Sequence, residues 1–145
     1  MSKEKKAQHR EFVQSVITRM NANSFQIKGL MITLVAAFLG IYASNSNSTF
    51  IIIPLPIVLL FWFLDAYYLQ LERKFRGIYN DICDITPENE KKTKINFLMN
   101  PNLYKGGSFT FWNVFTSRSI LPLYLSILVS LLCLYLYLRC SCILQ

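Results

Sequence analysis

The sequence predicts an all-α membrane protein in which three helices cross the bilayer. Three apolar runs carry this prediction, at residues 25–44, 50–71 and 119–138. Twenty helical residues rise ~30 Å, which is the thickness of the hydrocarbon core. The composition agrees, because 53% of the residues are hydrophobic and only 16% are charged, whereas average soluble domains carry roughly 25% charged residues. The 145 residues are enough for a single membrane domain.

Residues 1–24 are expected to form a polar tail and a short amphipathic helix. The first twenty residues contain no apolar stretch typical of a cleaved signal peptide. Helical spacing then gathers one apolar face, made of Phe12, Val13, Val16, Ile17 and Met20. The sequence NANS at 21–24 predicts a break, with Ser24 as the N-cap of the first span.

The first span, residues 25–44, carries one charge and one unusual face. Lys28 lies one turn inside, where a lysine can extend its ammonium to the headgroups. Small side chains recur at helical spacing, at Thr33, Ala36, Gly40 and Ser44. Such a row lets a second helix approach closely.

The second span, residues 50–71, follows a short polar turn at 44–49, and Pro54 and Pro56 fall in its first turns. Apolar residues then continue past the membrane at alternating spacings of four and three. We call this row the seam; it consists of Leu64, Tyr68, Leu71, Phe75, Ile78, Ile82 and Ile85. It predicts a stalk helix that reaches about Ile85, with Gly77 as a weak point. The seam can pack against the N-terminal helix of the same chain or, as we favour, against other copies.

Residues 72–118 are expected to form the stalk and a long loop. Thr86 and Pro87 resemble a helix cap and first turn, and the aromatic stretch at 109–115 is typical of the bilayer interface, where Trp112 is favoured. The third span, residues 119–138, has Pro122 near its start, and residues 139–145 are expected to form an external tail.

The basic residues predict the orientation. Six Lys or Arg residues precede or enter the first span and eight lie between the second and third, whereas the turn at 44–49 has none and the C-terminal tail has only Arg139. The positive-inside rule therefore places the N-terminus and the long loop in the cytoplasm and the C-terminus outside.

Asp65 lies near the cytoplasmic end of the second span, and Lys28 lies near the same end of the first. Antiparallel neighbours would bring the two charges to similar depth. A lone charge in hydrocarbon costs ~2.5–3.5 kcal/mol on insertion scales, and pairing removes much of that cost. We therefore favour an ion pair that fixes the helix register, with a gate or ion-pathway residue as the alternative.

The stalk and loop also carry a basic surface. Its anion-binding candidates are Arg73, Arg76, Lys91, Lys92, Lys94 and Lys105. Positive-inside topology and attraction to anionic membrane lipid explain these charges most simply. Binding of a nucleotide or oligonucleotide is the alternative, because phosphates favour clustered Lys and Arg.

Nothing in the sequence predicts an enzyme, a cofactor or a metal site. The four cysteines form no CxxC pair, and His9 is the only histidine. No hydrolase, metalloprotease or P-loop motif occurs. The C-terminal CILQ fits a prenylation pattern, but prenylation is cytosolic and this end is expected outside.

Three blocks of sequence resemble a family of small, uncharacterised bacterial membrane proteins with three spans. They are VITRMNANSFQIKGLMITLVAA, FWFLDAYYLQLERKFRGIYNDI and FLMNPNLYKGGSFTFWNVFTSRSILPLYLSIL. The end, CLYLYLRCSCILQ, departs from that pattern. The resemblance implies the bacterial inner membrane and, since similar proteins are effectors of nucleotide-regulated anti-phage defence, a cytosolic nucleotidyltransferase as partner.

Together these features predict a homo-oligomeric membrane effector or channel that is gated from the cytoplasmic side. The alternative is a non-conducting membrane anchor or adaptor that presents its stalk to a partner.

Overall fold

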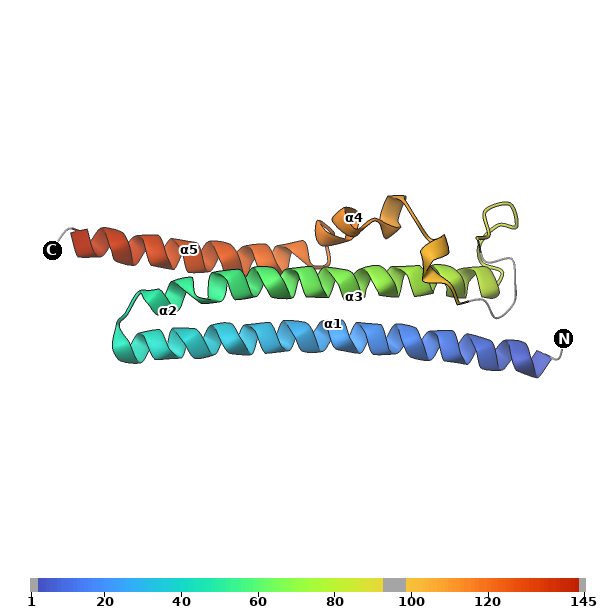
Figure 1. The fold of residues 1–145 in the computed structure, drawn as a ribbon, viewed down its shortest axis with the longest axis horizontal. Helices are drawn as coiled ribbons and strands as arrows, with labels where there is room; N and C mark the ends of the chain where they lie inside the picture. Colours follow the sequence, from blue (N-terminus) through green and yellow to red (C-terminus); the bar gives the residue numbers. More distant parts are fainter. Residues whose placement is uncertain (1–2, 93–98, 144–145) are drawn as a thin grey trace. The chain divides into compact units, whose positions relative to one another are not determined.

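The computed structural model describes residues 3–92 and 99–143, and within them all regular structure is helical. Three of the helices are long and apolar enough to cross a membrane. The predicted fold class is therefore confirmed, and the chain is a candidate multi-pass membrane protein. The helices are α1 (Lys3–Asn45), α2 (Thr49–Ile52), α3 (Pro54–Ile82), α4 (Phe111–Phe115) and α5 (Leu121–Ile143), with 3-10 turns at Pro101–Leu103 and Gly107–Phe109 (Figure 1).

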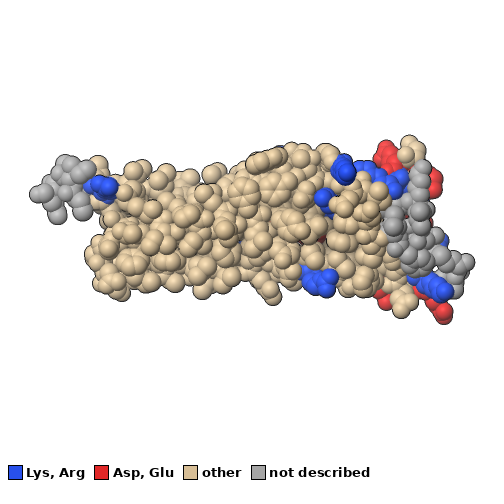
Figure 2. Space-filling model, in the orientation of Figure 1, with Lys and Arg blue, Asp and Glu red and all other residues tan. Residues whose placement is uncertain are grey.

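The chain divides into two compact units of different character. We call residues 1–24 with 66–114 the polar unit, and residues 25–65 with 115–145 the apolar unit. The apolar unit contains four charged residues, Lys28, Asp65, Arg118 and Arg139. All the other Lys, Arg, Asp and Glu residues belong to the polar unit, and the surface over α5 is almost uncharged (Figure 2).

The break predicted at residues 21–24 is absent from the structure, because α1 continues through it. It is one helix of 43 residues that runs straight through this segment. Asn and Ser cost at most about 0.7 kcal/mol each relative to Ala in a helix, and the segment contains neither Gly nor Pro. Ser24 is buried inside the helix rather than acting as an N-cap. The amphipathic helix and the first span are therefore one element.

The second span begins with a local interruption. Helix α2 ends at Ile52 and α3 starts at Pro54, with Ile53 between them in helical conformation. Pro54 and Pro56 have no backbone N–H to give to the preceding turn, so the regular hydrogen bonding lapses there. Beyond this point α3 continues without a break through Gly77, where the sequence suggested a weak point.

The stalk ends three residues before the predicted limit, at Ile82, in a Schellman motif. Asp84 has a left-handed backbone with φ of 57°. The N–H of Ile85 donates to the carbonyl of Asn80 at 2.9 Å, and that of Asp84 donates to Asp81 at 3.4 Å. These two bonds satisfy carbonyls that the end of a helix leaves open. A residue other than glycine therefore terminates the stalk.

One further prediction needs correction after the stalk. Residues 86–92 form turns, in which the N–H of Glu90 donates to the carbonyl of Pro87, so Thr86 and Pro87 do not begin a helix within the described residues. Helix α5 has Pro122 as its second residue, as expected, and it continues to Ile143. Most of the predicted tail at 139–145 is thus helical.

The polar unit has a small core of its own. Val13 of α1, Ile78 of α3 and Tyr104 of the loop are buried together. Burial of a side chain such as Ile78, which has 0% exposure, contributes about 1.5–3 kcal/mol. Partly buried residues surround this core: Ile17, Phe75, Tyr79, Ile82, Met99 and Phe109.

Candidate functional site

Lys28 and Asp65 form the ion pair that the sequence predicts, within the apolar unit. The Lys28 ammonium lies 2.9 Å from Oδ1 and 2.7 Å from Oδ2 of Asp65, so it bridges both carboxylate oxygens. The Asp65 side chain is fully buried, whereas that of Lys28 is 24% exposed. This ion pair, with its hydrogen bond to Oδ1, joins α1 to α3 and fixes their register.

An aromatic cluster that was not predicted lies beside Asp65. Tyr124 of α5 is fully buried, and the charge of Asp65 is close enough to act on it. Trp62 stacks on Phe115 with ring centroids 4.3 Å apart and on Tyr124 with centroids 5.8 Å apart. Its indole N–H also donates to the Phe115 carbonyl at 3.1 Å. The ring stack therefore attaches the start of the third span to α3 beside Asp65.

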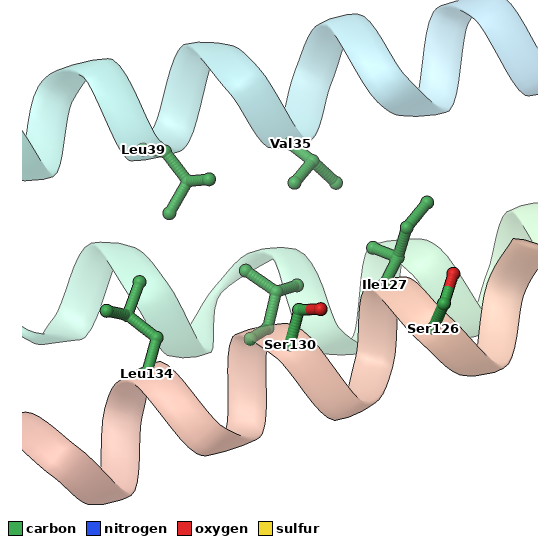
Figure 3. A pocket seen from close by; sticks show the side chains of 7 residues that line it. Val35, Leu39, Ser126, Ile127, Ser130 and Leu134 are labelled. Atoms are coloured by element: carbon green, nitrogen blue, oxygen red, sulfur yellow. The ribbon is translucent and has the colours of Figure 1, made fainter.

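A pocket of about 270 Å³ opens between α1 and α5 in the apolar unit. Figure 3 shows Val35 and Leu39 of α1 pointing toward Ile127 and Leu134 of α5. The remaining lining residues are Ser126, Ser130 and Leu131. No charged side chain lines this pocket, so its chemistry suits apolar chains and not an ion.

The small residues of the first span lie on the exposed side of α1. Thr33, Ala36, Gly40 and Ser44 are all exposed, and we call them the small-residue face. The buried Met31 lies nine residues before Gly40, which at 100° per residue is half a turn away. A Cβ atom built on Gly40 would meet nothing within 4 Å. The described chain therefore leaves this face uncovered.

The hydroxyls on this face already have backbone acceptors. Thr33 Oγ1 donates to the Gly29 carbonyl at 2.9 Å, and Ser44 Oγ donates to the Gly40 carbonyl at 3.3 Å. These bonds satisfy the polar groups inside an apolar environment while the side chains stay small. The face is smooth and hydrogen-bonded, which suits close helix packing.

One part of the seam packs inside the chain, and its two ends are exposed. Ile78 is fully buried against Val13, and Phe75 and Ile82 pack on the same core, so its far end contacts the N-terminal part of α1 in the same chain. Tyr68 and Leu71 are half-buried. Leu64 is 40% exposed and Ile85 is 65% exposed. Intrachain packing, the alternative we did not favour from sequence, therefore accounts for the part between Phe75 and Ile82.

Tyr104 locks the loop onto the stalk. Its ring lies over Gly77, where the missing Cβ leaves room for it. Its hydroxyl donates to Asp81 Oδ2, which also accepts the backbone N–H of Lys92 at 2.9 Å. Asp81 is 5% exposed and Tyr104 is 3% exposed. The sequence offered one signal for this contact, a glycine inside a helix.

The anion-binding candidates within the described residues do not form one cluster, and most have different partners within the chain. Arg73 donates to the Ser108 carbonyl at 3.2 Å, and Arg76 pairs with Glu72 at 2.7 Å. The Lys92 ammonium lies 5.5 Å from the centroid of the Tyr104 ring. Lys105 is exposed. Lys94 lies outside the described residues.

Lys91 is held by two carboxylates. Its ammonium lies 2.7 Å from Asp84 and 2.6 Å from Glu88. The hydrogen bonds to Asp84 and Glu88 raise the pKa of Lys91 to about 12. The hydrogen bond and charge of Lys91 in turn hold the pKa of Asp84 below its ordinary value. The charge of Lys91 is therefore already neutralised by Asp84 and Glu88.

Comparisons of the chain with protein-family models, with curated proteins and with solved structures find no match. The family resemblance therefore stays an expectation. Support for a function comes from the ion pair, the small-residue face and the polar unit.

Proposed function

We propose that the chain is a homo-oligomeric membrane effector or channel, gated from the cytoplasmic side, whose copies pack through the small-residue face of α1. The observation that carries this proposal is that this face lies opposite the buried side of α1. Lipid offers little hydrophobic drive for helix association, so close backbone approach at small residues supplies it through van der Waals contact. Such an exposed face favours a second membrane helix as its neighbour.

Helices α1 and α3 supply the route from signal to membrane. Each contributes residues to both the polar and the apolar unit without a break in the helix at the boundary. A binding event that tilts or rotates either helix in the polar unit would thus act on a membrane span. The buried Lys28–Asp65 pair would keep α1 and α3 moving together rather than serve as the pore itself.

The proposal includes an orientation and a setting. The polar unit and the N-terminus face the cytoplasm, because the basic residues gather there. The family resemblance adds the bacterial inner membrane, anti-phage defence and a cytosolic nucleotidyltransferase as partner. A neighbouring gene for such an enzyme would support this setting, and its absence would remove it.

A non-conducting anchor or adaptor is the second candidate. The polar unit has its own core around Ile78 and Tyr104, which suits a module that presents a surface to a partner. The apolar pocket between α1 and α5 has no charged lining, which also suits a span that conducts nothing. Conductance separates the two candidates.

The test is reconstitution of the full chain into liposomes, with leakage of ions and oligomeric state measured together. Gly40→Leu adds bulk to the small-residue face without meeting any atom of its own chain within 4 Å of the Cβ. Cys133→Leu, at an exposed position on α5, is the matched control. We expect Gly40→Leu to break the oligomer and abolish leakage, and Cys133→Leu to change neither.

The outcomes separate the hypotheses. A monomer in mild detergent and in bilayers contradicts the oligomer. A defined oligomer that leaks under no nucleotide or oligonucleotide condition leaves the anchor as the better function. Equal effects of Gly40→Leu and Cys133→Leu exclude the small-residue face as the interface.

A further inference from the structure

A second pocket lies in the polar unit between α1 and α3, with a volume of about 350 Å³. Gln14 and Ile17 line it from α1, and Arg76, Tyr79 and Asn80 line it from α3. Small-molecule pockets typically enclose roughly 300–1,000 Å³. Its size therefore fits a small molecule, and its lining mixes polar groups with an apolar wall.

The lining of this pocket carries positive charge at Arg76 of α3. Arg76 is 60% exposed and pairs with Glu72 through Nη2. A guanidinium carries five N–H donors, so one ion pair leaves donors for a ligand. Arg10 lies one turn before Gln14 on α1, outside the pocket lining. No carboxylate lines the described pocket.

The other lining groups suit the organic part of an anion. The amides of Gln14 and Asn80 each offer donors and an acceptor. The ring of Tyr79 and the side chain of Ile17 supply apolar contact. An arginine beside amides and one aromatic ring matches a phosphate ester, because guanidinium binds phosphate through paired N–H groups.

We propose that this pocket binds the phosphate ester of a small organic molecule, with Arg76 on the phosphate and Gln14, Tyr79 and Asn80 around the organic part. This chemistry occurs in soluble nucleotides and in lipid headgroups. The inference rests on the proposed function, for which this pocket would receive the gating signal. It is tested by measuring ligand binding, without any measurement of leakage.

The experiment uses the full chain in nanodiscs of zwitterionic lipid, titrated with AMP by calorimetry. Arg76→Gln removes the phosphate donor and should weaken AMP binding tenfold or more, since a hydrogen bond to a charged group is lost. Arg73→Gln is the matched control, because Arg73 is on the same helix but outside the pocket lining. That variant should bind within about twofold of the parent.

Two additions keep the test decisive. Gln14→Ala probes the same pocket from α1 and leaves the Arg76–Glu72 pair intact, so it covers the case in which Arg76→Gln does not fold. Nanodiscs with phosphatidic acid test the lipid source through lipid retention in native mass spectrometry. If the parent retains phosphatidic acid but does not bind AMP, and Arg76→Gln loses the phosphatidic acid, the pocket binds a lipid headgroup.

The remaining outcomes overturn the proposal. Binding of neither AMP nor phosphatidic acid contradicts it, and so does equal weakening by Arg76→Gln and Arg73→Gln. Binding of AMP by a protein whose liposomes never leak keeps the pocket and rejects the channel. Failure of the site and failure of the proposed function are therefore distinguishable.

Discussion

A Cβ atom placed on Gly77 would stand 2.6 Å from two ring carbons of Tyr104. No ordinary van der Waals contact is that short, so the missing side chain at Gly77 is a requirement of the loop and not of the helix. The backbone of α3 is regular at this point. Glycine at position 77 thus weakens the helix locally but leaves room for the Tyr104 ring, whose hydroxyl donates to Asp81.

We predict that Gly77→Ala destabilises the polar unit, although alanine favours a helix interior by about 1 kcal/mol over glycine. Overpacking against Tyr104 should cost about 1–3 kcal/mol and outweigh that gain. Amide hydrogen exchange at residues 75–82 would measure the change. In a Tyr104→Ala background the obstacle is gone, so Gly77→Ala should there be neutral or stabilising. Destabilisation in both backgrounds would refute the steric explanation.

Substitutions in the Lys28–Asp65 pair should be unequal. Lys28→Gln leaves the fully buried Asp65 without its cation and should cost about 3 kcal/mol or more. Asp65→Asn leaves Lys28, which is 24% exposed and can reach the headgroups, so it should cost less. The double variant should cost less than the sum of the two. Reversible unfolding in mixed micelles measures all three, and strict additivity would count against the pair.

Stability of the turn after α3 should depend on pH at both extremes. The lowered pKa of Asp84 means that its contribution is present above its ordinary pKa of about 3.9 and is lost as the pH falls through the lowered value. The raised pKa of Lys91 means that its contribution is present below about 10.4 and is lost as the pH rises toward about 12. Carbon NMR titration of the Asp84 carboxyl should show the lowered pKa, and Lys91→Gln should raise it toward its ordinary value. An ordinary pKa in the parent protein would contradict the ion pair.

Reporter fusions test the orientation. A fusion within residues 86–94 should report the cytoplasm, and a fusion after Gln145 should report the outside, because the basic residues gather in the polar unit. Both sites are compared in the same strain, so expression differences do not decide the result. A cytoplasmic signal from Gln145 would overturn the three-span orientation and revive prenylation of CILQ.

The apolar runs, the charge within the second span and the apolar spacing after it predicted the spans, the ion pair and the long second helix. The apolar runs located the spans because the bilayer imposes a length, and the membrane cost of a lone charge predicted the partner of Asp65. The apolar spacing past residue 71 predicted that the helix continues beyond that residue, as α3 does to Ile82. These features follow from solvation and helix geometry alone.

Contacts between distant segments were beyond the sequence. The stacking of Trp62 on Phe115 and Tyr124 depends on where the third span returns, which no local pattern encodes. The break expected at residues 21–24 does not occur, because Asn and Ser disfavour a helix only weakly, whereas a proline or glycine disfavours it strongly. The seam predicted contact but could not choose its partner, since a copy and the chain's own α1 offer the same chemistry.

The buried ion pair also bears on how the protein enters the membrane during synthesis. Lys28 and Asp65 are separated by 37 residues, so the first charge leaves the ribosome well before its partner exists. An unpaired charge within a span is costly to insert, and Asp65 has no exposed route to water. Release of α1 and α3 into lipid together, as a helical hairpin, avoids exposing either charge alone. The pair would thus favour entry of the two spans into lipid together over entry of one after the other.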